Sequence, residues 1–230
     1  MMRVERLKRA AGEAAAAFVR DGWAVGLGTG STVQYTLLEL GRRVREEGLD
    51  IVGVPTSART EATARESGIP LGDLDELGRL DIAIDGADEV DPRHDLIKGL
   101  GGALVREKVV AVHSRELVIV VDEGKLVATL GTRAPLPVEV LRMGHRRLEH
   151  ELARLGCTVA LRHAPGSNAP FVSDNGNYIY DCRFPSIADP RHIEREVKSM
   201  VGVVESGLFL GLAGRVVVAS RTGVSVRDRP

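Results

Sequence analysis

The sequence has little cysteine and no long apolar run, and both shortages exclude classes of protein. Its 230 residues include two cysteines, Cys157 and Cys182, which lie far apart and outside any CxxC or Cys/His cluster. Neither a disulfide framework nor a structural zinc site is therefore expected. No apolar run approaches the roughly 18 residues that span a bilayer, and the first residues alternate charge with alanine, unlike a signal peptide. We expect a cytoplasmic protein with no membrane partner.

An excess of charge of either sign is also missing. The chain has 31 Lys+Arg against 32 Asp+Glu, a formal net charge of −1. Binding to a phosphate backbone needs basic residues in excess on one face, so no nucleic-acid partner is expected. Aromatic residues make up only 3% of the sequence, but 43% of it is hydrophobic, which is ordinary for a globular protein.

Lysine is scarce among the basic residues. Only five are lysine, and three of these, Lys98, Lys108 and Lys125, lie between positions 98 and 125. The preference for arginine reflects either a GC-rich genome or multidentate surface ion pairs, and the sequence leaves both open. Against this bias, each lysine is a candidate for a site that requires a compact ammonium charge.

Strands and helices alternate along the first 130 residues. Strands are expected at 23–27, 51–54, 81–84 and 117–121, with helices over 3–20, 33–47, 58–67 and 103–112. This alternation predicts an α/β fold with a Rossmann-like parallel sheet, right-handed crossovers and ligands at the carboxyl ends of the strands.

The pattern changes after residue 130. A strand at 135–140, a helix over 144–155, strands near 157–162 and 178–182, a helix from 189 to about 200 and a strand at 204–210 follow. This order is the ferredoxin-like split unit. We therefore predict a small α+β domain over 131–206, inserted into a Rossmann-like domain of residues 1–130 and 207–230. The last apolar run, 216–219, either rejoins the first sheet or forms an edge.

The segment Gly28-Thr29-Gly30-Ser31-Thr32 lies between a strand and a helix. Glycines let backbone N–H groups approach an anion, the hydroxyls add donors, and the helix start contributes partial positive charge. This favours a phosphate or a similar dianion. A tight turn with Ser31 or Thr32 capping the helix is the alternative. The dinucleotide fingerprint GxGxxG is not met in either frame.

Carboxylates gather after the third strand, in Asp85-Gly86-Ala87-Asp88-Glu89 with Asp91 beyond. They suggest acid/base chemistry or, more weakly, a metal site, because the calcium-loop spacing is absent and only His94 is near. An Asx-turn leading into a solvated loop is the structural alternative.

A third motif runs from Lys98 through Gly99-Leu100-Gly101-Gly102 into a helix that carries Glu107. Lysine before the glycines reverses the order of a nucleotide P-loop, yet the segment still offers an anion cradle. Glu107 is flanked by Arg106 and Lys108, so it is either a functional carboxylate or part of surface charge pairing. Lys125 follows another strand and completes four polar strand ends, which we expect to converge on one crevice of the sheet.

These motifs, in this order and spacing, resemble the A-type ribose-5-phosphate isomerases. The resemblance rests on GTGST, DGADEVD, KGLGGALVREK, VDEGKLV and PLPVEV, with VSDNGNYIYD and GLFLG in agreement, and it covers nearly the whole chain. It implies an aldose–ketose isomerase that interconverts ribose 5-phosphate and ribulose 5-phosphate through an enediolate, with no metal or organic cofactor. It also implies a homodimer or homotetramer, and we expect the small domain, whose sheet has one face not covered by its helices, to contribute to the interface.

The resemblance also implies roles for individual residues. Thr29, Gly30, Ser31 and Thr32 would bind the phosphate with Lys8, and the segment Asp85, Gly86, Ala87, Asp88 would contact the sugar, with both aspartates assisting ring opening. Lys98, Gly99, Leu100 and Gly101 would line the substrate, Lys98 would stabilise the oxyanion, Glu107 would be the catalytic base, and Lys125 would contact substrate. Leu100 departs from the family's run of glycines. A positive φ there would be costly for leucine, although its N–H can donate from an ordinary conformation.

Two alternatives remain at the level of sequence. One is a non-catalytic sugar-phosphate sensor of the kind found in transcriptional regulators, for which the roughly 22 residues before the first strand are too few to hold a DNA-binding helix pair. The other is a related sugar-phosphate deaminase or acyl-CoA transferase, which should differ at LVREK.

Overall fold

The computed structural model describes residues 2–230, with side chains from Val4 onward, and the chain divides into two compact units. Unit 1 contains the chain up to Ala87 together with Arg106–Leu126 and Gly211–Pro230, and unit 2 contains Asp88–Val105 and Val127–Leu210. Within the described residues, no helix is long and apolar enough to cross a membrane.

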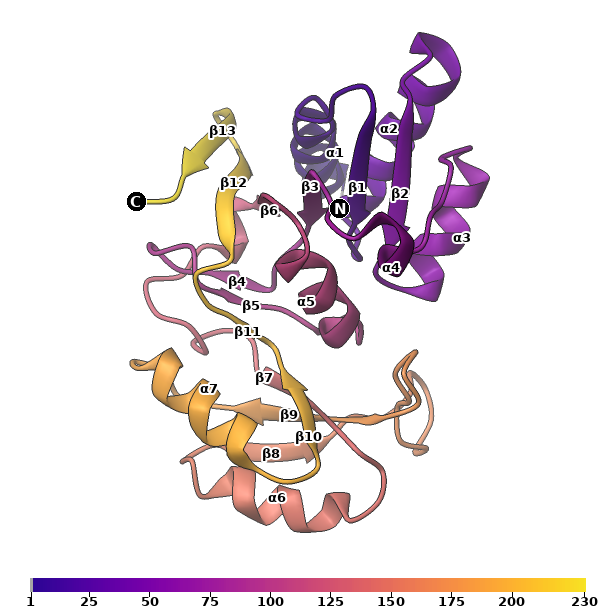
Figure 1. The fold of residues 1–230 in the computed structure, drawn as a ribbon. Helices are drawn as coiled ribbons and strands as arrows, with labels where there is room; N and C mark the ends of the chain where they lie inside the picture. Colours follow the sequence, from indigo (N-terminus) through magenta and orange to yellow (C-terminus); the bar gives the residue numbers. More distant parts are fainter. Residues whose placement is uncertain (1) are drawn as a thin grey trace. The chain divides into compact units, whose positions relative to one another are not determined.

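Unit 1 is built on a six-stranded sheet in the order β13-β12-β6-β3-β1-β2 (Figure 1). The strands are β1 (Trp23–Leu27), β2 (Ile51–Pro55), β3 (Ile82–Asp85), β6 (Leu117–Asp122), β12 (Ala213–Ser220) and β13 (Gly223–Asp228). All neighbours pair in parallel except the β12–β13 hairpin. The predicted Rossmann-like sheet is confirmed, and the apolar run 216–219 does rejoin it.

Helices cover both faces of this sheet because its strands are apolar on both sides. The helices that pack in unit 1 are α1 (Met2–Ala16), α2 (Val33–Glu47), α3 (Ala58–Glu66), α4 (Leu74–Leu77) and α5 (Leu104–Val112), the last of which begins in unit 2. Val25 and Leu27 share one core with α1 and α2. Gly26 points to the other face, where a Cβ would lie 2.5 Å from Val110 on α5, so only glycine permits this approach.

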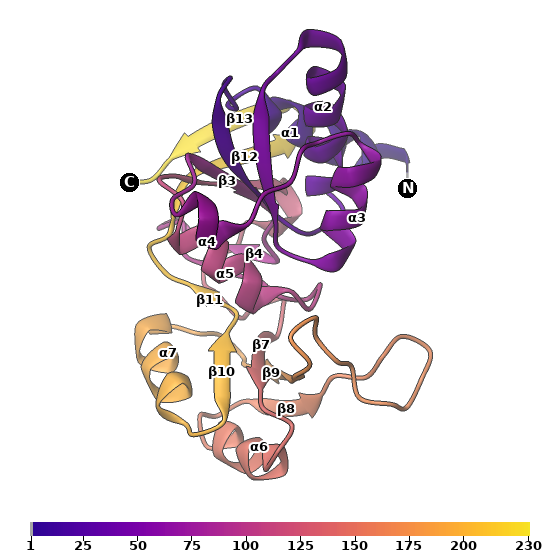
Figure 2. The same cartoon turned by 45° about the vertical axis from the view of Figure 1, so that its right-hand side comes forward.

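Unit 2 contains a four-stranded antiparallel sheet in the order β10-β7-β9-β8 (Figure 2). Its elements are β7 (Leu136–Val140), α6 (His145–Ala153), β8 (Thr158–Leu161), β9 (Tyr178–Arg183), α7 (Pro190–Ser199) and β10 (Val203–Ser206). The chain order β-α-β-β-α-β with this strand order is the predicted ferredoxin-like unit. Leu148 of α6 and Val197 of α7 share a core with Val138 and Tyr180, so both helices cover the same face.

Unit 2 differs from the predicted small domain because it also takes in residues 88–105, 127–130 and 207–210. The physical reason is a small three-stranded antiparallel sheet of β4 (Glu89–Val90), β5 (Leu96–Ile97) and β11 (Leu208–Phe209). The strand expected at 204–210 breaks at Gly207, where a Cβ would collide with the Lys98 carbonyl.

The second face of the four-stranded sheet is occupied within unit 2. Pro137 lies on this face, next to Gly99 and Gly207. Residues of the same unit therefore pack on this face at Pro137.

Candidate active site

Polar groups follow three neighbouring strands of the unit 1 sheet. β1 leads into the Gly28–Thr32 loop, β3 ends at Asp85, and β6 is followed by a 3-10 turn, Glu123–Lys125. The chain leaves β1 toward β2 on one side and reaches β3 on the other, so the strand order reverses at β1/β3. In open parallel sheets, ligands bind outside the carboxyl ends of the strands at such a reversal.

The expected fourth strand end does not belong to this sheet. Lys98 follows β5, which pairs with β4 and β11 in unit 2. The sequence could not reveal this, because a two-residue strand carries no periodic signal.

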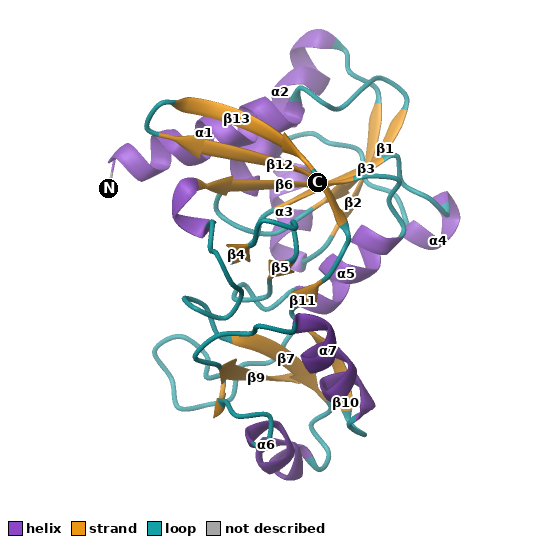
Figure 3. Cartoon of the chain, turned by 90° about the vertical axis from the view of Figure 1, so that its left-hand side faces the viewer, coloured by secondary structure: helices purple, strands orange, loops and turns teal. Residues whose placement is uncertain are grey.

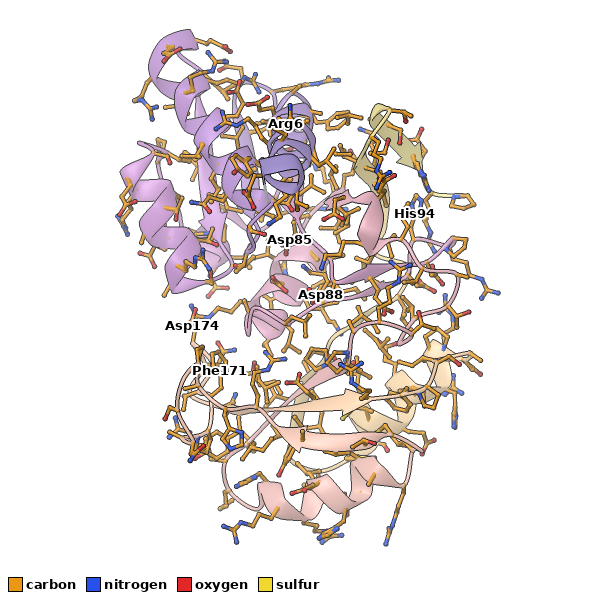
Figure 4. All side chains as sticks on the ribbon, turned by 180° about the vertical axis from the view of Figure 1, so that it is seen from behind. Arg6, Asp85, Asp88, His94, Phe171 and Asp174 are labelled. Carbon is orange, nitrogen blue, oxygen red and sulfur yellow. The ribbon has the colours of Figure 1, made fainter. Side chains whose placement is uncertain are left out.

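Asp85 anchors the Gly28–Thr32 loop from beneath. Its Oδ1 accepts hydrogen bonds from the backbone N–H of Thr29 at 3.0 Å and of Gly86 at 2.7 Å, and the side chain is buried. A Cβ at position 28 would overlap the Asp85 carboxyl group, which explains the glycine. Figure 4 labels Asp85 at the end of β3. This carboxylate is thus committed, at least through one oxygen, to holding the loop.

The Thr29 hydroxyl lies in a cluster of hydroxyls and not in a capping position. Its Oγ1 is 2.8 Å from Thr56 Oγ1, 2.8 Å from Ser57 Oγ and 3.0 Å from Thr60 Oγ1. The cluster also ties down the strand end, because Thr60 Oγ1 donates to the Gly28 carbonyl at 2.9 Å. With its N–H on Asp85 and its hydroxyl in this cluster, Thr29 supports the loop through contacts inside the protein.

Sequence reasoning missed Thr56, Ser57 and Thr60 as parts of this support. Ser57 does cap α3, accepting from the Thr60 N–H at 3.1 Å. A run of hydroxyl residues directly after a strand next to the glycine loop is the signal that could have suggested the cluster.

The residues that lead into α2 are accessible to solvent. Gly30 and Ser31 are exposed and Thr32 is half-buried. Thr32 is the N-cap residue, and within the described chain its side chain makes no capping hydrogen bond. The interpretation of Thr32 as a structural cap is therefore not supported, and the N–H groups of the first turn carry their partial positive charge toward an anion.

Lys8 lies on the face of α1 that meets the start of α2. Gly12, one helical turn beyond Lys8, packs so tightly that a Cβ would lie 3.0 Å from the Thr32 carbonyl. Lys8 Nζ pairs with Glu5 Oε1 at 3.0 Å, and Tyr35 of α2 donates to Glu5 Oε2 at 2.7 Å. The hydrogen bonds from Tyr35 and Lys8 lower the pKa of Glu5, so this carboxylate stays ionised beside the ammonium group.

Glu107 is 4% exposed and lies in the first turn of α5. Burial argues against the alternative of mere surface charge pairing, since a carboxylate is rarely buried without a purpose or partners. Lys125, in the turn after β6, is half-buried, and Asp122 closes that turn by accepting from the Gly124 N–H at 2.8 Å.

Unit 2 holds the other predicted residues. Lys98 is 2% exposed, its backbone N–H donates to the Gly207 carbonyl at 2.9 Å, and its ammonium lies 5.3 Å from the centre of the Phe209 ring. Asp88 Oδ2 accepts from the Leu100 N–H at 3.0 Å. A buried lysine beside a glycine turn can supply fixed positive charge to an oxygen that becomes negative.

The backbone at Leu100 is ordinary. Among the described residues other than glycine, only His94 has a positive φ. The left-handed positions of this loop are Gly99 (φ 106°) and Gly102 (φ 84°), which the sequence keeps as glycine. Leu100 is therefore tolerated, and its N–H donates from an ordinary conformation as expected.

Two carboxylates of the acidic cluster serve the fold. Glu89 is fully buried and accepts from the N–H groups of Gly131, Arg133 and Ala134 at 2.5–2.7 Å. Asp91 Oδ1 accepts from Arg93 and Asp95, which is the Asx-type turn proposed as the alternative. The part of the chain that is described brings together no group of three or more His, Cys, Asp or Glu suited to a metal ion.

Comparison with known proteins places these features in one family. A family model described as ribose 5-phosphate isomerase A (phosphoriboisomerase A) matches residues 52–223. Ribose-5-phosphate isomerase A of Thermomicrobium roseum is 50% identical over 229 residues, which cover 99% of this chain and 96% of the relative.

Solved structures agree over the whole fold. Ribose 5-phosphate isomerase A from Methanocaldococcus jannaschii has a TM-score of 0.93 at 40% identity, covering 97% of this chain and 99% of its own. A D-ribose-5-phosphate isomerase in complex with phospho-erythronic acid has a TM-score of 0.95 at 39% identity, covering 98% and 99%. With the glycine loops, the buried Glu107 and these matches over nearly its full length, the chain belongs to the ribose-5-phosphate isomerase A family.

Proposed function

We propose that this protein interconverts D-ribose 5-phosphate and D-ribulose 5-phosphate through an enediolate intermediate. The observation that carries the proposal is the buried carboxylate of Glu107 at the start of a helix, in a chain of this family that also exposes an anion-binding loop after β1. Isomerisation moves a proton between two adjacent carbons, and a single carboxylate that takes the proton and returns it is sufficient.

The Gly28–Thr32 loop supplies the phosphate site and Glu107 the base in this proposal. The outward N–H groups at Gly30, Ser31 and Thr32 bind the phosphate with the help of the α2 helix start and Lys8. Glu107 removes the proton from C2 of the open-chain aldose and delivers it to C1, while the hydroxyl proton passes from O2 to O1. Lys125 contacts the substrate from the turn after β6. Asp85 contributes to the sugar site while one of its oxygens holds the loop.

The segment from Asp88 to Gly101 supplies the other proposed contacts. Lys98 stabilises the negative oxygen of the enediolate, which is the kind of interaction that commonly contributes most to catalysis. Asp88 contacts sugar hydroxyls and assists ring opening, and the Gly99–Gly101 backbone lines the substrate. No step of this mechanism is routed through a metal or an organic cofactor.

The comparisons do not support the alternative functions. The family match and the relatives named above are isomerases throughout and give no support to a sensor, a deaminase or a CoA transferase. A ribose 5-phosphate assay in the presence of a chelator tests both the activity and the independence from metal ions.

We also propose a cytoplasmic homodimer or homotetramer in which unit 2 contributes to the interface. Strongly exposed apolar side chains of unit 2 support this proposal: Leu141 and Met143 follow β7, and Val201 precedes β10. Leu141 and Val201 lie near each other, since the Leu141 N–H donates to the Gly202 carbonyl at 2.8 Å. Covering such a patch is favourable in proportion to its apolar area.

Replacing the base tests the proposed reaction. Glu107→Gln keeps shape and hydrogen-bonding capacity but cannot accept a proton, so kcat should fall by about 10²–10⁴-fold with KM little changed. Wild-type enzyme in deuterated water should place deuterium on the carbon next to the carbonyl, and the variant should lose exchange and isomerisation together.

Glu61→Gln is the matched control, because Glu61 lies in the first turn of α3, is half-buried and pairs with Arg65. It should behave as wild type. If Glu107→Gln exchanged deuterium at the wild-type rate, Asp85 or Asp88 would be the base instead.

A further inference from the structure

Arg162 donates hydrogen bonds to the loop that follows Lys98, although it lies 63 residues from Gly99 in the sequence. It follows β8, and its Nη1 donates to the Gly99 carbonyl at 2.8 Å and to the Leu100 carbonyl at 3.3 Å. Its side chain is only 11% exposed. All of these residues belong to unit 2.

The guanidinium is itself held in place. Arg162 Nε donates to Asp181 Oδ2 at 3.0 Å, and Nη2 donates to Asp181 Oδ1, so the pair is bidentate. The planar fork of arginine allows two bonds to one carboxylate while a third N–H reaches elsewhere, which lysine cannot reproduce. Asp181 is on β9, so the loop is tied to the four-stranded sheet.

The ring of Phe171 packs beside both Arg162 and Gly102. The Arg162 guanidinium lies 5.8 Å from the centre of the Phe171 ring, and a Cβ at Gly102 would lie 2.5 Å from Phe171 Cζ. Phe171 is on the loop between β8 and β9, which Figure 2 shows as one long connection and on which Figure 4 labels Phe171 and Asp174; the loop leads into β9, which is labelled in Figure 3. The ring therefore fixes the Gly102 end of the turn while Arg162 fixes its Gly99 end.

Opposite charges hold the two ends of one peptide group. The carbonyl of Gly99 and the N–H of Leu100 belong to the same planar unit and point in opposite directions. Arg162 takes the carbonyl and Asp88 takes the N–H. Arg162 also donates to the Leu100 carbonyl, so it holds two successive peptide groups of the loop.

We propose that Arg162 is a positioning residue for the isomerisation, which orients the Gly99–Gly101 backbone and the adjoining Lys98 toward the reacting oxygens of the substrate. This inference rests on the proposed function. It assigns Asp181 and Phe171 the task of holding the guanidinium, and it gives the β8–β9 loop a part in catalysis without contact with the substrate.

The test compares Arg162→Met and Arg162→Lys with the wild-type enzyme. Displacing catalytic groups by about 1 Å can cost about 10²-fold, so kcat of Arg162→Met should fall by about 10- to 100-fold. The Kd for inorganic phosphate should stay within about twofold, because that anion is bound by the other loop. Arg162→Lys keeps a cation beside Asp181 and preserves the fold, yet kcat should not be restored, since the ammonium cannot serve Asp181 and both carbonyls together.

Arg142→Met is the matched control. Arg142 donates through Nε to the Gly176 carbonyl at 2.6 Å and lies 5.3 Å over the Tyr178 ring, so it has the same kinds of contact at another place in unit 2. Its kcat should remain within about twofold of wild type. In a double-mutant cycle with Lys98→Arg, the loss from Arg162→Met should be much smaller than in the wild-type background, because both act through one loop.

The outcomes separate the two proposals. A wild-type protein that does not isomerise ribose 5-phosphate would overturn the proposed function and this inference with it. An active wild type with a folded Arg162→Lys or Arg162→Met variant of full kcat would overturn the inference alone. The inference would also be overturned if the fold-losses in kcat of Arg162→Met and Lys98→Arg multiplied in the double mutant. An equal loss of kcat in Arg142→Met would overturn it too.

Discussion

The two glycine loops of the candidate site are held by different chemistry. The Gly28–Thr32 loop rests on the neutral hydroxyls of Thr56, Ser57 and Thr60 and on one oxygen of Asp85. The Lys98–Gly102 loop is held by charged groups, namely Asp88 and the Arg162–Asp181 pair. Hydroxyls can donate or accept as needed, whereas a guanidinium fork has a fixed geometry.

This difference suggests a division of work. A loop that binds a phosphate by its own N–H groups needs the right shape, which hydroxyls at its back can provide without adding charge. A loop that meets charge developing during the reaction must not move as that charge appears, and rigid charged contacts provide this. Changes behind the first loop should therefore affect binding, and changes behind the second should affect turnover.

One acidic motif serves both loops. Asp85 holds the first loop and Asp88 the second, while Glu89, the next residue, holds the turn at residues 131–134. The carboxylates of DGADE thus have three separate structural targets. This explains why they are crowded in the sequence.

The largest effect is expected at Lys98, within the charged loop. Lys98→Arg preserves the charge but spreads it over a larger, planar group in a buried place beside Phe209, so kcat should fall by about 100-fold in steady-state assays. Lys198→Arg, at an exposed lysine paired with Glu205, is the control and should be neutral. Full activity of Lys98→Arg would mean that the second loop does not depend on a compact charge.

A smaller effect is expected from the hydroxyl cluster. Thr60→Val keeps the shape but leaves the Gly28 carbonyl and the neighbouring hydroxyls without one partner, which should lower the free energy of unfolding by about 1–3 kcal/mol in urea titrations. KM should rise by a few-fold while kcat changes little, and Thr60→Ser should restore KM.

Thr63→Val is the matched control for this prediction. Thr63 is on the same helix, is half-buried, and its hydroxyl donates to the local Arg59 carbonyl. An unchanged KM in Thr60→Val, or an equal change in Thr63→Val, would show that the cluster does not support the phosphate loop.

The smallest effect is expected at Leu100. Its φ is ordinary and its side chain is 43% exposed, so Leu100→Gly should leave kcat within about twofold and lower the free energy of unfolding by about 0.5–1 kcal/mol through the entropy of the unfolded chain. Thermal unfolding and steady-state kinetics measure both quantities. A large gain in kcat would indicate that leucine obstructs the loop.

Local sequence patterns predicted most of the fold. Alternating strands and helices predicted the Rossmann-like sheet, and the β-α-β-β-α-β order predicted the ferredoxin-like unit. Short elements with little periodicity were not predicted. One is β5, which places Lys98 outside the parallel sheet. The break of the expected strand at Gly207 was not predicted either.

Residues of the candidate site could be predicted where they form a contiguous motif. They could not be predicted where a contact joins residues that are distant in the sequence. The GTGST loop and the segment from Lys98 to Glu107 stand out in the sequence because their residue types are concentrated. Nothing local to Arg162 indicates that it reaches Gly99, and nothing local to Thr60 indicates that it reaches Gly28. Such contacts depend on tertiary packing, which pairs residues without leaving a pattern along the chain.

The most direct test of the division between the loops is calorimetric titration of two probes into the wild type, Ser31→Asp and Lys98→Arg. On the proposed function, inorganic phosphate should bind at the first loop alone, whereas phospho-erythronic acid carries a carboxylate that should also meet the second loop. Ser31→Asp places a like charge at the anion site and should weaken both probes by at least about tenfold. Lys98→Arg should weaken only phospho-erythronic acid and leave the Kd for inorganic phosphate within about twofold. Equal weakening of inorganic phosphate by Lys98→Arg, or unchanged phosphate binding in Ser31→Asp, would contradict the division.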